Sequence, residues 1–205
     1  TRFFAAVSHD LRTPITRLRL RAELLADETT RQRFRDDLQR MEEMVSASLD
    51  FLRSGELEDA REQVDIDALL QGLQADFHDL GAEVTIQGSA RPLVAHASGL
   101  HRCLQNLLEN AVRHAGGIIE VQLDDSAERL HIGIADRGPG IDEALLERVM
   151  EPFYREDEAR SEDTAGYGLG LSIARQIASA HGGSLTLQPR EGGGLLAILD
   201  LPRQG

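Results

Sequence analysis

The sequence predicts two modules of different fold class, an α-helical hairpin over residues 1–55 and an α/β two-layer sandwich over residues 64–205. Three observations support this division. Apolar residues recur at spacings of three and four up to Leu52, as on the face of a helix. Beyond residue 64, short β-type runs are mixed with helical runs, as in a sandwich of helices on a sheet. The polar run 56–63, which follows Ser54-Gly55, is predicted to be a linker.

The hairpin is predicted from two apolar stripes that flank the polar stretch 27–30. The first stripe consists of Phe4, Val7, Leu11, Ile15, Leu18, Ala22 and Leu25. The second consists of Phe34, Leu38, Met41, Val45 and Leu52. Two helices of about 22 residues, each roughly 33 Å long, leave part of both stripes in water when they pack only on each other. We therefore expect the hairpin to dimerise into a four-helix bundle.

The sandwich is predicted from the order of its elements. Helices are expected over 67–77, 98–114 and 169–180, with a short one over 142–150. Strands are expected over 83–87, 93–95, 118–123 and 130–135, and two more close the chain. Helices and strands mixed in this order favour helices packed on a sheet.

The chain is strongly acidic: 35 acidic residues face 22 basic ones, all of them Arg, for a formal net charge of −13. This charge disfavours binding to nucleic-acid phosphates, and an acidic nucleotide would need a metal ion and locally placed Arg. Cys103 is the single cysteine, so no internal disulfide is expected. No run reaches the roughly 18–20 apolar residues of a membrane span. A first residue already helical in character suggests a fragment of a longer protein.

Four patches in the second module are predicted to meet at one ligand. The first, over 104–114, places Asn106, Asn110 and Arg113 at i, i+4 and i+7, which is one polar stripe of a helix. Carboxamide oxygens suit Mg²⁺, and the Arg guanidinium suits phosphate. Taken alone, the stripe is equally compatible with a solvated helix face.

The other three patches are a turn and two loop segments. DRGPGI (136–141) follows a predicted strand, so its carboxylate could accept a hydrogen bond from a purine amino group, although an isolated DxGxG is mostly a turn. EPFYR (151–155) opens an irregular loop. GYGLGL (166–171) leads into a helix, whose free N–H groups could bind phosphate.

In this order and spacing, the four patches resemble the N, G1, F and G2 boxes of the GHKL (Bergerat) ATP-binding fold found in histidine kinases and their relatives. FFAAVSHDLRTPITRLRLRAELL resembles the phosphoacceptor box of the HisKA dimerisation domain. Together they are similar to sensor histidine kinases of two-component systems, in particular the EnvZ-like subgroup. The resemblance implies ATP and Mg²⁺ as cofactors and the cytoplasmic portion of a cell-membrane protein. The ATP-binding residues that it implies are Asn106, Asn110, Arg113, His114, Asp136, Gly138, Gly140, Phe153, Arg155, Gly166, Gly168, Gly170 and Leu171, with Asn110 also at the metal.

The stretch SHDLRTP (8–14) is the candidate reaction centre of the first module. His9 lies off the apolar seam, and Asp10 can accept the hydrogen bond of the imidazole N–H, which raises the nucleophilicity of the other nitrogen. The resemblance implies that His9 takes the γ-phosphoryl group of ATP and passes it to an Asp of a response regulator. It also implies that Thr13, one turn later, positions a water for dephosphorylation of that regulator.

Pro14 lacks an N–H and clashes with the carbonyl four residues back, so a bend or soft point is expected there. This could be a functional hinge or a passive kink. The loop between Phe153 and Gly168 carries five acidic residues against two Arg, which we interpret as the outer face of a mobile ATP lid. Tyr167 stands where the resemblance leads us to expect Thr or Ser, and it could cap the adenine or simply fill space.

Two alternative functions remain open from the sequence. An ATP-driven clamp or chaperone would share the N, G1 and G2 boxes, but has no need of SHDLRTP on a dimerising hairpin. A catalytically silent scaffold would have no need of the full set of matching polar residues.

Overall fold

The computed structural model describes residues 13–53, 59–114, 117–155 and 166–203. The chain consists of two compact units, Thr1–Arg53 and Ser54–Gly205. Within the described residues, no helix is both long and apolar enough to cross a membrane.

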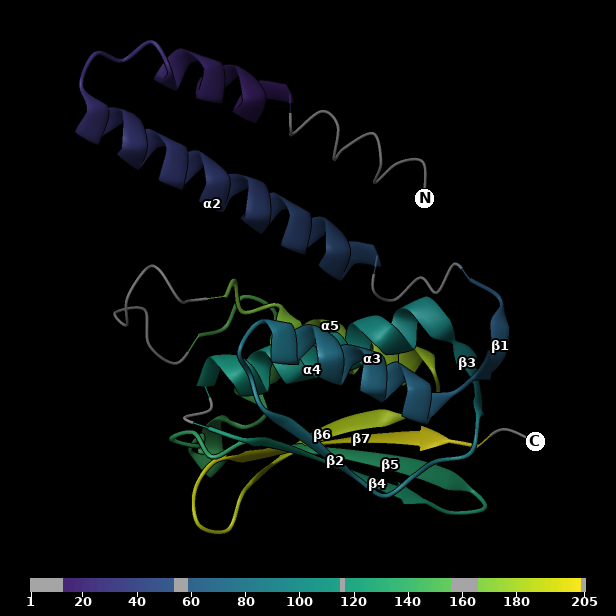
Figure 1. Ribbon diagram of the computed structural model, residues 1–205. Helices are drawn as coiled ribbons and strands as arrows, with labels where there is room; N and C mark the ends of the chain where they lie inside the picture. The colour runs from purple at the N-terminus through teal and green to yellow at the C-terminus, as the bar shows by residue number, and fades with distance from the viewer. Residues whose placement is uncertain (1–12, 54–58, 115–116, 156–165, 204–205) are drawn as a thin grey trace. The chain divides into compact units, whose positions relative to one another are not determined.

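The first unit is a helical hairpin, as predicted (Figure 1). A helix over residues 13–22 is followed by a turn and by α2, Glu28–Arg53. Asp27 caps α2, because its Oδ2 accepts hydrogen bonds from the amide and the hydroxyl of Thr30 at 2.8 and 2.6 Å. The polar interruption in the sequence is therefore the point at which the chain reverses.

The core of the hairpin is small. Ile15, Ala22 and Leu38 are each 4% exposed, and Leu25 and Val45 pack against them. Two ion pairs join the helices on the surface, Arg19 with Glu42 at 2.6 Å and Arg35 with Glu23 at 2.5 Å. Exposed pairs of this kind contribute less than about 1 kcal/mol each, so apolar burial is the main source of stability.

The second unit is a two-layer α/β sandwich, also as predicted (Figure 1). Helices α3 (Ile66–Asp79), α4 (Ala97–His114) and α5 (Gly170–Ala180) cover one face of a five-stranded sheet. In spatial order β2-β4-β5-β7-β6, the strands are Val84–Gln87, Ile119–Asp125, Arg129–Ala135, Leu195–Pro202 and Ser184–Pro189. β2 and β4 run parallel, and the other neighbours are antiparallel.

Buried and half-buried residues alternate along the strands, so the hydrophobic core lies between the sheet and the helices. In β5, for example, Leu130, Ile132 and Ile134 are at most 2% exposed, whereas the residues between them are half-buried on the other face. The buried faces of α4 and α5 meet this surface with residues such as Leu104 and Ile177. The two helices that carry the first and fourth patches are therefore packed on the sheet.

Two local elements differ from the predictions. Strand β1, Arg61–Val64, occupies the end of the segment predicted to be a linker and pairs antiparallel with β3, Leu93–His96. Its burial pattern has only one buried residue, so periodicity gave no signal. The short helix predicted over 142–150 is two 3₁₀ turns, Glu143–Leu145 and Arg148–Met150. The first is set by Asp142, whose side chain accepts from the Ala144 amide at 2.9 Å.

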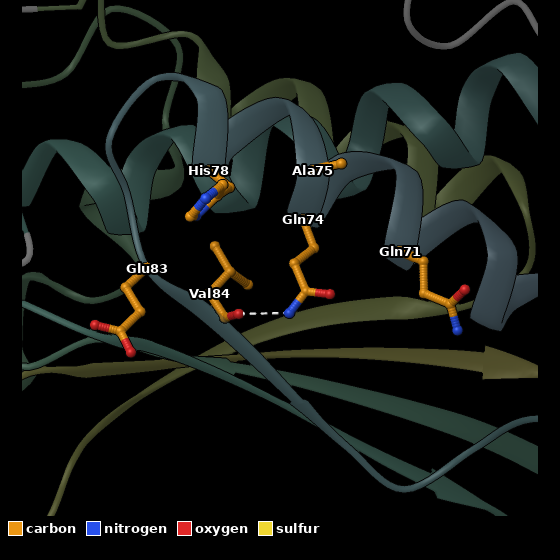
Figure 2. A pocket seen from close by; sticks show the side chains of 6 residues that line it. All are labelled: Gln71, Gln74, Ala75, His78, Glu83 and Val84. Atoms are coloured by element: carbon orange, nitrogen blue, oxygen red, sulfur yellow. Dashed lines mark hydrogen bonds between the residues drawn. The ribbon is translucent and has the colours of Figure 1, made fainter.

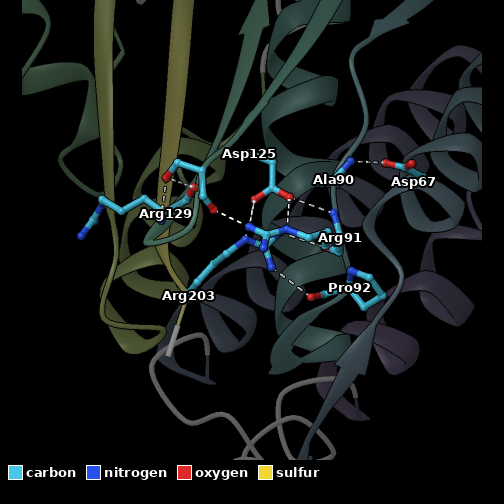
Figure 3. Close-up of polar contacts among 8 residues, drawn as sticks. Asp67, Ala90, Arg91, Pro92, Asp125, Arg129 and Arg203 are labelled. Carbon is cyan, nitrogen blue, oxygen red and sulfur yellow. Dashed lines mark hydrogen bonds and ion pairs between the residues drawn. The ribbon is translucent and has the colours of Figure 1, made fainter. Parts of the chain in front are cut away.

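A polar network at one end of the sheet fixes the C-terminal strand (Figure 3). Asp125, at the end of β4, accepts hydrogen bonds from Arg91 Nε at 3.0 Å and from Arg203 Nε at 2.5 Å. Arg203 also donates to the carbonyl of Pro92 at 3.0 Å. The hydrogen bonds from Arg91, and then those from Arg203, hold the pKa of Asp125 well below its usual range.

Candidate active site

Asp136 is the best-fixed polar group of the predicted site. It follows β5 directly and is 4% exposed. Its Oδ1 accepts hydrogen bonds from the amides of Gly138 and Leu195 at 2.8 and 3.2 Å. Its own amide donates to the Leu195 carbonyl at 2.9 Å. Both hydrogen bonds to the carboxylate end on Oδ1, so Oδ2 is the oxygen placed to meet a ligand.

The turn between β6 and β7, which the sequence analysis did not predict, contacts the backbone of Asp136. Arg190, at the end of β6, donates from Nη1 to the Asp136 carbonyl at 3.2 Å and from Nη2 to Glu120 Oε2 at 2.7 Å. Arg137 donates to the other oxygen of Glu120 at 3.0 Å. These bonds, that from Arg190 first, lower the pKa of Glu120. Arg190 is therefore a positioning residue for the buried carboxylate.

Close backbone approach explains the glycines around Asp136. Gly194 has φ 103°, and a Cβ there would overlap the Asp136 carbonyl. A Cβ on Gly138 would overlap the carbonyl of His114, at the end of α4. The run Gly192-Gly193-Gly194 ahead of the last strand was the signal in the sequence that could have revealed this turn.

Helix α4 brings its polar stripe to the loop that precedes α5. The Asn106 side chain donates from Nδ2 to the Arg102 carbonyl at 2.8 Å, and its Oδ1 would lie 3.2 Å from a Cβ on Gly170. Two turns along, a Cβ on Gly166 would overlap the guanidinium of Arg113. The polar stripe of the first patch therefore lines the glycines of the fourth.

The third and fourth patches are hydrogen-bonded to each other. Phe153, with φ 65°, donates its amide to the Gly168 carbonyl at 2.9 Å. Gly168 has φ 69°, and a Cβ there would lie 2.7 Å from the Tyr154 carbonyl, so a side chain is excluded. Tyr154 in turn lies under the guanidinium of Arg148, 4.7 Å from the ring centroid. Phe153 itself is 56% exposed and free to cover a ligand.

Helix α5 begins with amides suited to an anion. Its N-cap residue is Leu169, which makes no side-chain capping bond, and Gly170 is the first helical residue. The first N–H groups of a helix lack partners inside it and carry the positive end of the helix dipole. Leu171 is buried and anchors the first turn. The start of α5 can therefore bind a phosphate group.

The predicted site residues divide into four groups. The first group contains the residues through which the four patches contact one another. These contacts join Gly138 with His114, Gly166 and Gly170 with Arg113 and Asn106, and Phe153 with Gly168. The second group has no contact with another patch by the distances above. It contains buried Asp136 and Leu171, Gly140, half-buried Asn110 and exposed Arg155. His9, Asp10 and most of the predicted ATP lid lie outside the described residues. Thr13 belongs to the first unit, at the start of its described helix.

The side chains of the predicted site fit a metal ion that is held mainly by phosphate oxygens. Within the described ranges, no group of three or more His, Cys, Asp or Glu side chains could hold a metal ion. Asn106 and Asn110 offer carboxamide oxygens instead. Mg²⁺ in nucleotide sites is commonly bound by one or two protein oxygens together with phosphates and waters. The Asn side chains of this stripe could supply those protein oxygens.

A separate pocket lies between α3 and β2 (Figure 2). Its volume is about 270 Å³, and it is lined by Gln71, Gln74, Ala75, His78, Glu83 and Val84. Gln74 crosses it to donate to the Val84 carbonyl at 2.6 Å. None of the predicted site residues lines this pocket.

Comparisons with protein families agree with this geometry. Residues 95–205 match the family of histidine kinase-, DNA gyrase B- and HSP90-like ATPases. Residues 1–57 match the His Kinase A (phospho-acceptor) domain.

Individual relatives extend the match along the chain. The sensor histidine kinase GtrS of Pseudomonas aeruginosa is 42% identical over 98% of the chain and 42% of its own length. The sensor histidine kinase CpxA of Escherichia coli is 30% identical over 98% of the chain and 46% of its own length. The chain therefore spans somewhat less than half the length of these curated relatives.

Solved structures show the same fold. Full-length ShkA in complex with AMPPNP superposes with a TM-score of 0.76, at 24% identity, over 100% of this chain and 46% of that one. The histidine kinase AdeS of Acinetobacter baumannii gives a TM-score of 0.67, at 20% identity, over 96% and 98% of the two chains.

Proposed function

Since this chain belongs to the sensor histidine kinases, with a phosphoacceptor domain ahead of an ATPase domain, we propose that it transfers the γ-phosphoryl group of ATP to His9. From His9 the group passes to an Asp of a response-regulator receiver domain. One observation carries the ATP half of this proposal: the four patches, which are separate in sequence, contact one another in pairs between the turn of the buried Asp136 and the uncapped start of α5.

Each part of the nucleotide would have its own contacts. Oδ2 of Asp136 accepts a hydrogen bond from the adenine amino group, and Phe153 covers the base. The first amides of α5 and the guanidinium of Arg113 bind the phosphates. Asn110 would hold Mg²⁺ together with the phosphates, and the ion would supply neutralisation of the triphosphate charge.

Phosphoryl transfer would require little of the protein beyond positioning. One imidazole nitrogen of His9 forms a bond to the γ-phosphorus while the bond from that phosphorus to the bridging oxygen breaks, and ADP leaves. Asp10 accepts the hydrogen bond of the other ring N–H and balances the charge that develops on the ring. The roles of both residues rest on the sequence motif and the family.

A second activity is proposed for Thr13. In the reverse direction of signalling, its hydroxyl orients a water that attacks the phospho-Asp of a docked regulator. The proposal is supported by the HDLRT motif and by the position of Thr13 within the helix of the first unit, four residues after His9.

We propose that the hairpin dimerises, because several large apolar side chains are exposed in the single chain. They are Leu18, Leu20, Leu24, Phe34, Met41, Met44 and Leu52. Leu18 was predicted to lie on the first stripe and is 44% exposed, which a four-helix bundle would remedy. Sedimentation tests this: residues 1–54 should be dimeric and residues 59–205 monomeric. The second fragment begins at 59 so that it retains β1. A monomeric first fragment refutes the assignment.

The test of the kinase proposal is incorporation of labelled γ-phosphate. The wild type should acquire a label that is stable to base and lost in acid, and His9→Ala should acquire none while keeping its affinity for ADP. His78→Ala, far along the sequence on α3, is the matched control and should label normally. ATP hydrolysis without a stable label would instead indicate a clamp or chaperone, and absence of nucleotide binding a silent scaffold.

A further inference from the structure

The N-terminus of α4 is capped by a residue from another part of the chain. The helix begins at Ala97, and the residue before it is His96, which is not a good capping side chain. Asp59 supplies the cap instead, since its Oδ2 accepts a hydrogen bond from the Ser98 amide at 2.9 Å. Asp59 lies where the chain enters the second unit, two residues before β1. The entering segment is therefore tied to the helix that carries the polar stripe.

His96 holds the same segment through its imidazole. Its Nδ1 lies 2.5 Å from the Asp59 carbonyl, and its Nε2 lies 3.3 Å from Nε of Arg61. A carbonyl can only accept a hydrogen bond, and a guanidinium N–H can only donate. Nδ1 therefore carries the proton and Nε2 does not, so this ring is neutral.

His181, at the end of α5, has the same pattern. It is 6% exposed, its Nδ1 faces the Ile177 carbonyl at 2.8 Å, and its Nε2 accepts from the His96 amide at 3.2 Å. The two rings meet edge to face, with centroids 5.5 Å apart. Burial lowers the pKa of His181, and the proximity of His96 and Arg61 lowers it further. This ring is also neutral.

Among the residues that the structure describes, the charged and titratable groups recorded against the two rings are Asp59 and Arg61, beside the rings themselves. A proton added to Nε2 of His96 would point at the donor of Arg61. A proton added to Nε2 of His181 would point at the amide of His96. Protonation therefore replaces an acceptor with a donor in both cases. Asp59 Oδ1, which is buried and has no hydrogen-bond partner, lies 3.8 Å from His96 Nδ1 and would attract a charge on that ring. The release is therefore assigned to His181, whose Nε2 faces the His96 amide.

We propose that Asp59, His96 and His181 form a clasp that holds the entering segment on the ends of α4 and α5 at neutral pH and releases it when the imidazole of His181 takes up a proton. Release removes the cap of α4 and detaches the segment that begins at Asp59 from the ends of α4 and α5. The consequence for signalling rests on the proposed kinase function, whereas the clasp itself does not.

The test is hydrogen exchange of the 205-residue chain without nucleotide, so it is independent of kinase activity. The protection factor of the Ser98 amide should fall about tenfold when the pH is lowered from about 7.5 to about 5.5, after correction for the intrinsic effect of pH on exchange. A fall of this size corresponds to the free energy of about one lost helix cap. Amides of β5 should keep their protection. Equal protection of Ser98 at the two pH values overturns the proposal.

Variants separate the parts of the clasp. Asp59→Ala should reduce Ser98 protection about tenfold already at neutral pH. The Gln side chain offers a donor group and an acceptor group without titrating, so the double variant His96→Gln/His181→Gln should lose the pH dependence. His101→Gln, at an exposed position on α4, is the matched control and should retain it. Persistence of the pH dependence in the double variant overturns the proposal.

A measurement on the wild type covers the case in which the double variant does not fold. Ring-nitrogen chemical shifts at neutral pH report the tautomer of each histidine directly. Both His96 and His181 should carry the proton on Nδ1. An Nε2–H tautomer, or a charged ring, at either position overturns the proposal.

Discussion

Replacing Asp136 with Asn tests whether this carboxylate reads the base of the nucleotide. The oxygen of the new carboxamide can occupy the position of Oδ1 and keep the hydrogen bonds from Gly138 and Leu195, at 2.8 and 3.2 Å. The amide nitrogen then stands in place of Oδ2, where a donor meets the amino group of adenine. A lost hydrogen bond to a charged group costs about 1.5–3 kcal/mol, which weakens ADP binding about ten- to hundredfold.

The assay is calorimetric titration of ADP into the wild type and into Asp136→Asn, with urea unfolding to measure the stability of both. Stability should change by less than about 1 kcal/mol, because the backbone contacts persist. Asp142→Asn is the matched control, since Asp142 is an exposed cap in the following turn and Asn caps equally well. Its affinity for ADP should equal that of the wild type.

Binding of a second nucleotide tests the same contact with the base. Inosine diphosphate has a carbonyl in place of the adenine amino group, so the wild type should bind it more weakly than ADP. The carboxamide N–H of Asp136→Asn can donate to that carbonyl, and the preference for ADP should shrink or reverse in the variant. Unchanged ADP affinity in Asp136→Asn, or an equal loss for both nucleotides, would refute the role assigned to the carboxylate.

Three further outcomes are expected. Asn110→Asp should abolish autophosphorylation, because it places a negative charge beside the triphosphate; labelled ATP measures this, and an active variant would contradict it. Thr13→Ala should keep autophosphorylation and phosphotransfer while slowing dephosphorylation of a labelled regulator about 10²- to 10³-fold, with Thr13→Ser retaining a measurable share; equal decay rates would leave a simple kinase. Asp125→Asn should lose about 1.5–3 kcal/mol in urea unfolding at neutral pH. Since the folded pKa of Asp125 is lowered, its contribution is complete above the unfolded value of about 3.9 and is lost as pH falls further, so the variant and wild type should converge there.

Periodicity was sufficient for the elements that have one strongly apolar face. The hairpin turn at Asp27 and the buried face of α4 were both predictable, because spacings of three and four report the side of a helix that avoids water. The alternation in β5 was equally clear. The four patches could be recognised because each contains residue types whose chemistry is unusual for its element.

Contacts between distant segments could not be read in the same way. Strand β1 has one buried residue and is defined by its pairing with β3. Arg190 holds Asp136 from 54 residues away; the glycine run after it marks a turn but does not show which residue that turn contacts. The exposure of Leu18 in the single chain likewise depends on which neighbours surround the helix, not on its spacing.

The sequence by itself determined the fold class of the two modules, and it predicted the chemistry of the site and the residues that form it. Side-chain type and local spacing are enough for that, since a helix face, a glycine turn or an imidazole beside a carboxylate is a local property. The tertiary structure decided which groups meet. It brought Asp59 to the start of α4 and His96 against His181. Those contacts depend on long-range packing of the sheet and helices, which no local pattern of residues contains.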